Sequence, residues 1–150
     1  MKRAIPLETV HRVRDACLCL HVQRAARALA RRFDESLRPV GLTNGQFSLM
    51  TALSRPEPIG MGALASLLAM DRTTLTAAVK PLEARGLIRV LVDPADKRAR
   101  LLTLTDAGHA RLAEAMPIWE RAHAALEALL GQDDADRLRR DLRTLETRGT

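Results

Sequence analysis

The chain has 150 residues, of which 47% are hydrophobic, a length and composition typical of one domain with a buried core. Its net charge of +6 suits a polyanionic partner, whereas two cysteines are too few for a disulfide framework, and neither a signal sequence nor an apolar run of the roughly 20 residues that span a bilayer is visible. We therefore expect a cytoplasmic protein. We also expect it to be mainly helical, because the core must be built from aliphatic residues and Met rather than from aromatic residues.

Residues 7–40 are predicted to form one long helix. From Val10 to Leu20 apolar side chains recur at spacings of three and four, as on one face of a helix. Pro39 followed by Gly41 predicts its end.

A short helix is predicted over residues 43–53. Thr43 and Gln46 have the spacing of a capping box, in which each side chain accepts a hydrogen bond from the backbone of the other. The residues expected on its inner side are Phe47, Met50 and Leu53. A loop with two prolines follows at 55–58, after which Ile59 could add a strand to the sheet described below.

Two further helices, 61–68 and 71–85, are separated by a short turn and predict a helix-turn-helix. In the first, the residues expected to face inward are Leu64, Leu67 and Leu68. Asp71 is a favoured N-cap for the second helix, and Gly86 is expected to end it. The inward residues of the second helix are expected to be Leu75, Val79 and Leu82.

The opposite face of the second helix carries side chains that suit a DNA groove. They are Arg72, Thr73, Thr76, Ala77 and Lys80, with Thr74 to one side. Arginine can bind guanine through two hydrogen bonds, threonine can bond a base edge or touch a thymine methyl, and lysine can contact phosphate. The alternative interpretation is an ordinary solvated helix face.

A hairpin with a basic tip is predicted next. Residues 87–92 are rich in β-branched side chains, Asp93-Pro94 is a turn signal, and 101–105 form the returning strand. The tip between them carries Lys97, Arg98 and Arg100. Residues 72–100 hold seven Lys/Arg against three Asp/Glu, so the helix and hairpin suit a phosphate backbone or a minor groove.

The hairpin also carries a family signature. Asp96-Lys97-Arg98, followed by Leu104-Thr105 and Gly108, resembles the Asp-x-Arg, Leu-Thr and Gly pattern of the MarR family of winged-helix transcription regulators. The resemblance covers essentially the whole chain, including the preceding helix-turn-helix. We expect Arg98 to anchor the hairpin on DNA and Asp96 to orient Arg98 by charge attraction. The residues we assign to DNA binding are Arg72, Thr73, Thr74, Thr76, Lys80, Asp96, Lys97, Arg98 and Arg100.

The resemblance implies a mainly α fold with a small β-wing. Residues of about 43–108 would form the winged helix-turn-helix core of a single domain, and residues 7–40 and 106–148 would form dimerisation helices. The expected function is that of a homodimeric repressor, with activation as the minority alternative, released from an inverted-repeat operator by a small-molecule effector. In this family an effector often binds between the dimerisation helices and the core. The candidates for such a pocket are His21, Arg24, Phe47, Met50, Met116 and Trp119, with core packing preferred for Phe47 and Met50.

Two helices are predicted at the C-terminus. The first starts at Thr105 and ends at Gly131, and its apolar stripe is Leu112, Met116, Trp119, His123, Leu126 and Leu130. The second covers residues 133–148, with Leu138, Leu142 and Leu145 as a single stripe. A small DNA-binding core cannot cover all of these stripes, so a partner subunit is implied.

Cys17 and Cys19 are the residues that could support other chemistry. On one continuous helix Cys17 shares a face with His21 while Cys19 points away, which disfavours a metal site from all three and a disulfide between the cysteines. By resemblance, Cys19 falls where the peroxide-sensing branch of the MarR family carries its reactive cysteine. That branch also uses tyrosines to bind and tune the cysteine thiolate, and this chain has no tyrosine. A redox sensor acting through Cys19 is the alternative function.

Two other classes of function fit the sequence less well. A thiol-dependent enzyme using Cys17 or Cys19 is disfavoured, since the sequence has no Gly-rich phosphate loop, no Ser-His-Asp arrangement and no second metal-ligand cluster. A module that binds only protein through its terminal helices would have no use for a basic hairpin tip. We therefore predict no enzymatic activity, no cofactor, no metal site and no membrane partner.

Overall fold

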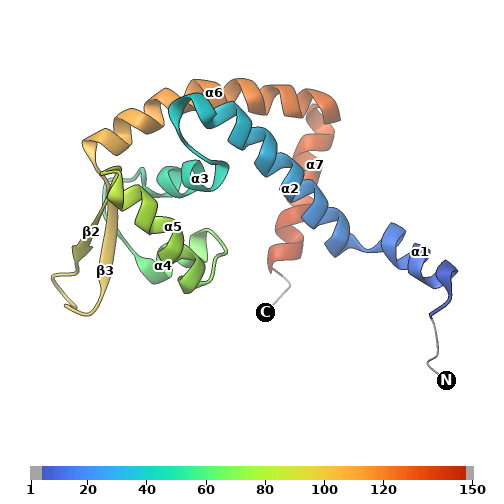
Figure 1. Cartoon of the computed structure of the whole chain (residues 1–150), viewed down its shortest axis with the longest axis horizontal. Helices are drawn as coiled ribbons and strands as arrows, with labels where there is room; N and C mark the ends of the chain where they lie inside the picture. The colour runs from blue at the N-terminus through green and yellow to red at the C-terminus, as the bar shows by residue number, and fades with distance from the viewer. Residues whose placement is uncertain (1–4, 148–150) are drawn as a thin grey trace.

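The computed structural model describes residues 5–147, which form seven α-helices, one 3-10 helix and three short strands (Figure 1). In chain order the elements are α1 (Leu7–Ala16), α2 (Leu18–Leu37), η1 (Arg38–Val40), α3 (Asn44–Leu53), β1 (Ile59–Gly60), α4 (Met61–Leu67), α5 (Arg72–Ala84), β2 (Ile88–Val92), β3 (Arg100–Leu104), α6 (Asp106–Leu130) and α7 (Gln132–Thr147). A mainly α fold with a small β-wing is thereby confirmed. None of the described helices combines the length and the apolar character needed to cross a membrane.

The three strands form one antiparallel sheet in the order β1-β3-β2. The hairpin pairs Ile88 with Leu104 at its base and Val92 with Arg100 near its tip. Ile59 pairs with Leu102, so the predicted additional strand is confirmed. The hairpin extends from the body as a wing next to α5 (Figure 1).

The core lies between α3, α4, α5, the sheet and the first half of α6. Its fully buried large side chains are Leu37, Leu49, Met50, Leu53, Leu64, Leu75, Leu82 and Leu102. The core is thus aliphatic, as the composition predicts. Burying a Leu side chain contributes about 1.5–3 kcal/mol, so this cluster is the main source of stability for the winged-helix part.

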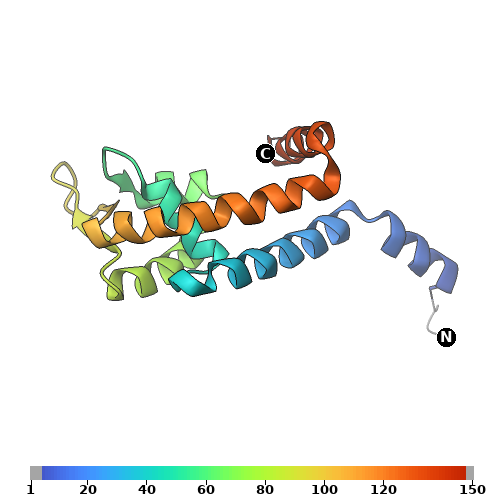
Figure 2. The same ribbon diagram turned by 90° about the horizontal axis from the view of Figure 1, so that it is seen from above.

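The prediction of one helix over residues 7–40 is wrong, because the chain breaks at Cys17. Cys17 has an extended conformation, with φ −71° and ψ 104°. Two side chains satisfy backbone groups beside the break: Leu20 N–H donates to Cys17 Sγ at 3.4 Å, and His21 Nε2 lies 3.0 Å from the Asp15 carbonyl oxygen. Because α1 buries none of its residues, no packing holds it in line with α2. Figure 2 shows α1 beyond the end of α2, away from the core.

The inward face of α4 also differs from the prediction. Leu64 is fully buried and Leu68 is half-buried, but Leu67 is 60% exposed, and Ala65 is buried in its place. On a helix Leu64, Ala65 and Leu68 span one side, whereas Leu67 lies outside that arc. At the other end of the chain, α7 starts at Gln132, one residue before the predicted start, and the predicted end at Arg148 lies outside the described residues.

Thr105 holds the end of α5, the hairpin and α6 together. Its hydroxyl donates to the Gly86 carbonyl oxygen at 2.6 Å and accepts from the Gly108 N–H at 3.0 Å as the N-cap of α6. Its own N–H donates to the Leu87 carbonyl oxygen at 3.1 Å. The end of α5 and the wing therefore share one base, held by Thr105.

Candidate nucleic-acid interface

The carboxylate of Asp71 sets the N-terminus of α5. It accepts hydrogen bonds from the Thr74 N–H at 2.8 Å and from the Thr74 hydroxyl at 2.6 Å. These bonds, the hydroxyl first, lower the pKa of Asp71, so the cap is ionised at neutral pH. The predicted N-cap is confirmed, and the Thr74 hydroxyl donates to the cap rather than outward.

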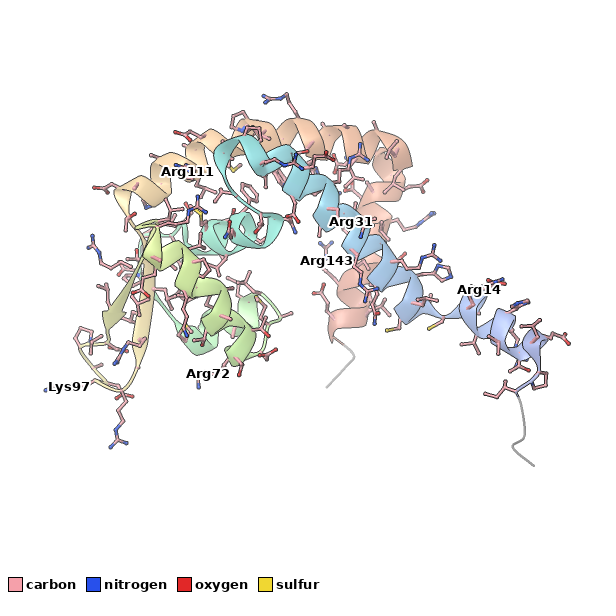
Figure 3. The ribbon with its side chains drawn as sticks, in the orientation of Figure 1. Arg14, Arg31, Arg72, Lys97, Arg111 and Arg143 are labelled. Atoms are coloured by element: carbon pink, nitrogen blue, oxygen red, sulfur yellow. The ribbon has the colours of Figure 1, made fainter. Side chains whose placement is uncertain are left out.

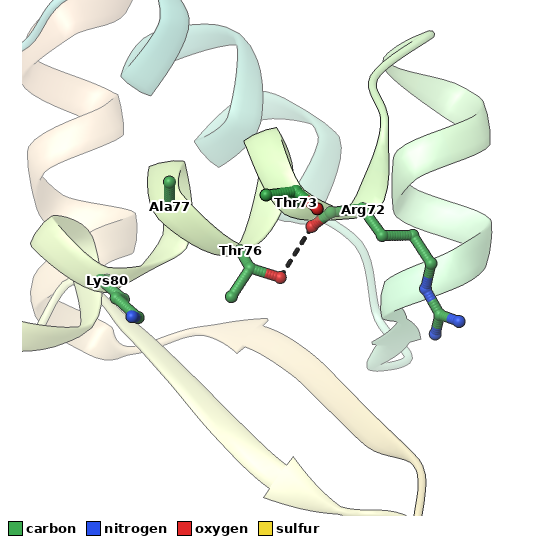
Figure 4. A pocket seen from close by; sticks show the side chains of 5 residues that line it. All are labelled: Arg72, Thr73, Thr76, Ala77 and Lys80. Atoms are coloured by element: carbon green, nitrogen blue, oxygen red, sulfur yellow. Dashed lines mark hydrogen bonds between the residues drawn. The ribbon is translucent and has the colours of Figure 1, made fainter.

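Four of the predicted DNA-binding side chains and the neighbouring Ala77 share one exposed face of α5. Arg72, Thr73, Thr76, Ala77 and Lys80 line a shallow surface hollow (Figure 4). On the opposite side Leu75, Val79 and Leu82 are buried, as their spacing predicts. We call the exposed set the α5 face.

Thr76 is constrained within the α5 face. Its hydroxyl donates to the Arg72 carbonyl oxygen at 2.7 Å (Figure 4). The hydroxyl proton is therefore used within the helix, while the oxygen can still accept a hydrogen bond. Such a side chain can accept a hydrogen bond from the amino group of adenine or cytosine, or touch a thymine methyl.

The tip of the wing is built by hydrogen bonds between acidic side chains and the backbone. Asp93 Oδ1 accepts from the Ala95 N–H at 2.8 Å, and Asp96 Oδ1 accepts from the Arg98 N–H at 2.9 Å. Among the ion pairs of residues 5–147, none joins the carboxylate of Asp96 to the guanidinium of Arg98. The idea that Asp96 orients Arg98 by charge attraction is therefore corrected, because Asp96 holds the backbone of Arg98 instead.

The basic residues of the tip have different surroundings. Arg100 Nη1 donates to the carbonyl oxygens of Lys97 and Ala99, each at 3.0 Å, and so closes the turn. Lys97 and Arg98 are exposed, and their charged groups take no part in the hydrogen bonds and ion pairs found within residues 5–147. Figure 3 shows Lys97 at the wing tip and Arg72 below α5, at the same lower edge of the molecule. The α5 face and the tip thus both carry exposed basic side chains.

The candidate effector residues fall into two groups. Phe47 and Met50 are buried, and Met116 and Trp119 are half-buried against the same core. The rings of Phe47 and Trp119 stack with centroids 6.0 Å apart. The other two candidates, His21 and Arg24, are exposed on α2 and line a surface hollow that includes none of these four residues.

The two cysteines do not lie on one continuous helix, so the argument that their side chains diverge no longer applies. Cys17 is half-buried at the break, while Cys19 is exposed in the first turn of α2 and its Sγ accepts a hydrogen bond from Gln23 Nε2 at 3.1 Å. Over residues 5–147 no three His, Cys, Asp or Glu side chains gather as a metal site. Both cysteines are free thiols.

Comparison with known proteins supports this geometry. The profile of the MarR family matches residues 42–99, from the end of η1 to the wing tip. The transcriptional regulator MosR of M. tuberculosis, in a crystal structure with DNA, is 40% identical with a TM-score of 0.79, covering 86% of this chain and 92% of that chain. The transcriptional repressor CouR, bound to a 23-mer DNA duplex, is 32% identical with a TM-score of 0.81, covering 89% of this chain and 95% of that chain.

Two further findings concern ligands and length. In its form bound to p-coumaroyl-CoA, CouR is 30% identical with a TM-score of 0.80, covering 92% of this chain and 96% of that chain. The transcriptional regulator HosA of Escherichia coli O111:H- is 39% identical over 77 residues, 51% of this chain and 57% of that protein. This chain spans about half the length of the first curated relatives that it matches.

Proposed function

Since this chain belongs to the MarR family of transcription regulators, we propose that it is a sequence-specific DNA-binding repressor that acts as a homodimer and leaves its operator when a small-molecule effector binds. The observation that carries this proposal is the α5 face, an exposed hollow of groove-reading side chains next to a basic wing. The DNA in the MosR and CouR structures and the ligand in the second CouR structure support it.

In the proposed complex, α5 enters the major groove, which is wide enough to admit a helix. The α5 face reads base edges, and Arg72 and Lys80 stand at its two ends, where cations can also contact phosphate. Lys97 and Arg98 at the wing tip reach the flanking backbone or the minor groove. The expected operator is an inverted repeat with half-sites about one helical turn apart.

The proposed dimer is formed by the terminal helices. Their exposed apolar residues include Val10, Val13, Leu129, Leu130, Leu138, Leu142 and Leu145, and each of these side chains is at least 36% exposed. Amphipathic helices normally bury such stripes, so a second copy of the chain would cover them. We accordingly assign residues 7–40 and 106–148 to dimerisation and residues 43–108 to DNA binding.

We also infer that the protein acts as a regulator rather than an enzyme, and that it works in the cytoplasm, where its DNA is. The names of the relatives described above, which are transcriptional regulators, support this inference. Footprinting on the promoter of its own gene tests the DNA-binding function directly. If no tested promoter contains a protected inverted repeat, this result would count against the DNA-binding function.

The α5 face gives a test of base readout. Thr76→Val keeps the shape of the side chain but removes the oxygen that can accept from a base, so discrimination at the contacted base pair should fall by about 1–3 kcal/mol. Lys97→Ala should instead weaken all sequences alike and lower the salt slope by about one unit for each phosphate that the lysine neutralises in the wild-type complex. Fluorescence anisotropy on operator and random duplexes measures both. Equal losses of affinity on the two duplexes for Thr76→Val, and likewise for Thr73→Ala, would exclude base readout.

A second candidate function, a redox-sensing variant of the same regulator, rests on the exposure of Cys19. A hydroperoxide would oxidise the Cys19 thiolate to a sulfenic acid and be reduced to an alcohol. The change would occur two residues from the break at Cys17, within the segment proposed for dimerisation. Oxidation should then lower operator affinity in wild type and in Cys17→Ser but not in Cys19→Ser. If wild-type affinity is unchanged after stoichiometric hydroperoxide, small-molecule binding remains the account of regulation.

A further inference from the structure

One face of α2 carries a row of basic side chains on a different element from the α5 face and the wing. Four basic residues line a single hollow with two alanines: His21, Arg24, Arg27 and Arg31, with Ala25 and Ala28. Spacings of three, three and four residues put the basic residues on one side of the helix. The alanines between them are small, so the hollow is open between the cations. We call these four basic residues the α2 basic row.

No acidic side chain balances the α2 basic row within its own stretch of helix. Residues 18–33 include four arginines and one histidine but no Asp or Glu. Within residues 5–147 no ion pair includes Arg24, Arg27 or Arg31. The hydrogen bond of the Arg27 guanidinium goes to the neutral amide of Gln23, at 3.4 Å.

The preceding carboxylate, Asp15, interacts by charge with His21 at one end of the row, but its main partner is Arg14. Asp15, at the end of α1, is bound by the guanidinium of Arg14 at 2.6 and 2.9 Å, and this bond lowers the pKa of Asp15. Cations three or four residues apart on a helix repel each other, and a bound anion removes that repulsion. Within the protomer, the charges of Arg24, Arg27 and Arg31 are therefore available to a ligand.

The row faces away from the packed side of α2. On the packed side Phe33 and Leu37 are buried, and α6 and α3 lie against the helix. In Figure 2, α6 runs along one side of α2, and none of the other helices and strands of residues 5–147 covers its other side. The basic residues of the row are exposed, so they have no role in the core of the protomer.

The geometry favours a ligand with several anionic groups. Arg24 and Arg31 are seven residues apart, which is about 10 Å along a helix. A single phosphate can be held by two neighbouring guanidinium groups, which match its oxygens bidentately, but it cannot reach the whole row. We propose that the α2 basic row binds a small molecule carrying two or more phosphate groups, and that this molecule is the effector, an assignment that rests on the proposed function.

The α2 basic row is connected to the DNA-binding part through the end of the same helix. From Leu37 the chain turns through η1 directly into α3. Asp34, near the end of α2, accepts a hydrogen bond from the Asn44 N–H at 2.6 Å at the start of α3. A ligand that shifts or stiffens α2 therefore acts on α3, which packs against α5.

Calorimetry with the full chain tests the binding site without DNA. The probe is inorganic tripolyphosphate, with orthophosphate and citrate as comparisons, at low salt. The triple variant Arg24→Gln, Arg27→Gln, Arg31→Gln should bind tripolyphosphate about tenfold or more weakly than wild type. The control variant Arg55→Gln, Arg121→Gln, Arg140→Gln loses the same charge at exposed positions elsewhere and should differ by less than about twofold. Circular dichroism checks that both variants are folded.

Three results of this calorimetry would overturn the assignment. They are the absence of saturable binding to wild type, equal weakening in both variants, and citrate binding as tightly as tripolyphosphate. The first result would show that there is no binding site. The second would show that binding depends only on the net charge of the protein, and the third that the site does not select phosphate groups. Because no operator is present, failure of the proposed DNA-binding function would leave this outcome unaffected.

Operator binding tests the effector role. Saturating tripolyphosphate should lower the operator affinity of wild type by about fivefold or more and leave that of the triple variant unchanged. A polyanion that only competed with DNA at the α5 face and wing would act on both proteins, so an equal effect on both would refute the role. The role is also refuted if the triple variant without tripolyphosphate has already lost most of its operator affinity, since the row would then be a DNA contact.

Discussion

Gly108→Ala is expected to destabilise the fold by about 3 kcal/mol. A Cβ at this position would lie 2.0 Å from the Leu87 carbonyl oxygen, and within 3.2 Å of a Leu104 methyl. Because the Leu87 oxygen is backbone and accepts the N–H of Thr105, it cannot move without shifting the base of the wing. The helix α6 can approach this closely only where it has no side chain.

Thermal unfolding measures this effect. For a chain of this size a loss of about 3 kcal/mol corresponds to a fall in Tm of roughly 10 °C. The matched control is Gly62→Ala in α4, where nothing lies within 4 Å of the added Cβ. That change should raise stability by about 0.5–1 kcal/mol, since Ala is the better helix former. Equal stability of Gly108→Ala and wild type would show that α6 does not pack on Leu87 in this way.

Arg98→Ala should weaken operator binding by about 1–3 kcal/mol and leave the unfolding free energy unchanged. Arg98 is exposed at the wing tip and is held there through its backbone N–H, so its guanidinium stabilises nothing within the described part of the chain. The charge is thus free for phosphate or for the minor groove. The measurement is an operator titration, with Arg140→Ala as a control that removes an exposed arginine from α7. Identical isotherms for Arg98→Ala and wild type would refute the assignment of the wing.

Asp96→Ala distinguishes two effects of Asp96 on operator binding: its positioning of the wing tip and its negative charge. Removing a carboxylate near DNA would by itself strengthen binding, because the surface becomes more positive. Asp96, however, holds the N–H of Arg98 at 2.9 Å, and its loss should release the tip. We expect Asp96→Ala to weaken operator binding, and tighter binding would show that the carboxylate has no positioning role.

The DNA-binding surface could be predicted to a large extent because its elements start and end at local signals. Thr43 with Gln46 and Asp71 cap helices as predicted, and Thr105, predicted as the start of the long C-terminal helix, is its N-cap. Each of these caps involves residues at most three positions apart. The helical spacing of Leu75, Val79 and Leu82 predicted which side of α5 is buried, and therefore which side is exposed. For the wing, the turn signal at Asp93-Pro94 lies just after the end of β2.

What the sequence by itself determined is therefore the order of the elements, most of their ends and the basic face that they present. The tertiary structure alone decided the features that depend on distant groups: the exposure of Leu67, the close approach of Gly108 to Leu87, and the direction of α1 relative to α2 at the break at Cys17. Local signals act through neighbours along the chain and can be read from the sequence, whereas these features depend on which surfaces meet when the elements pack.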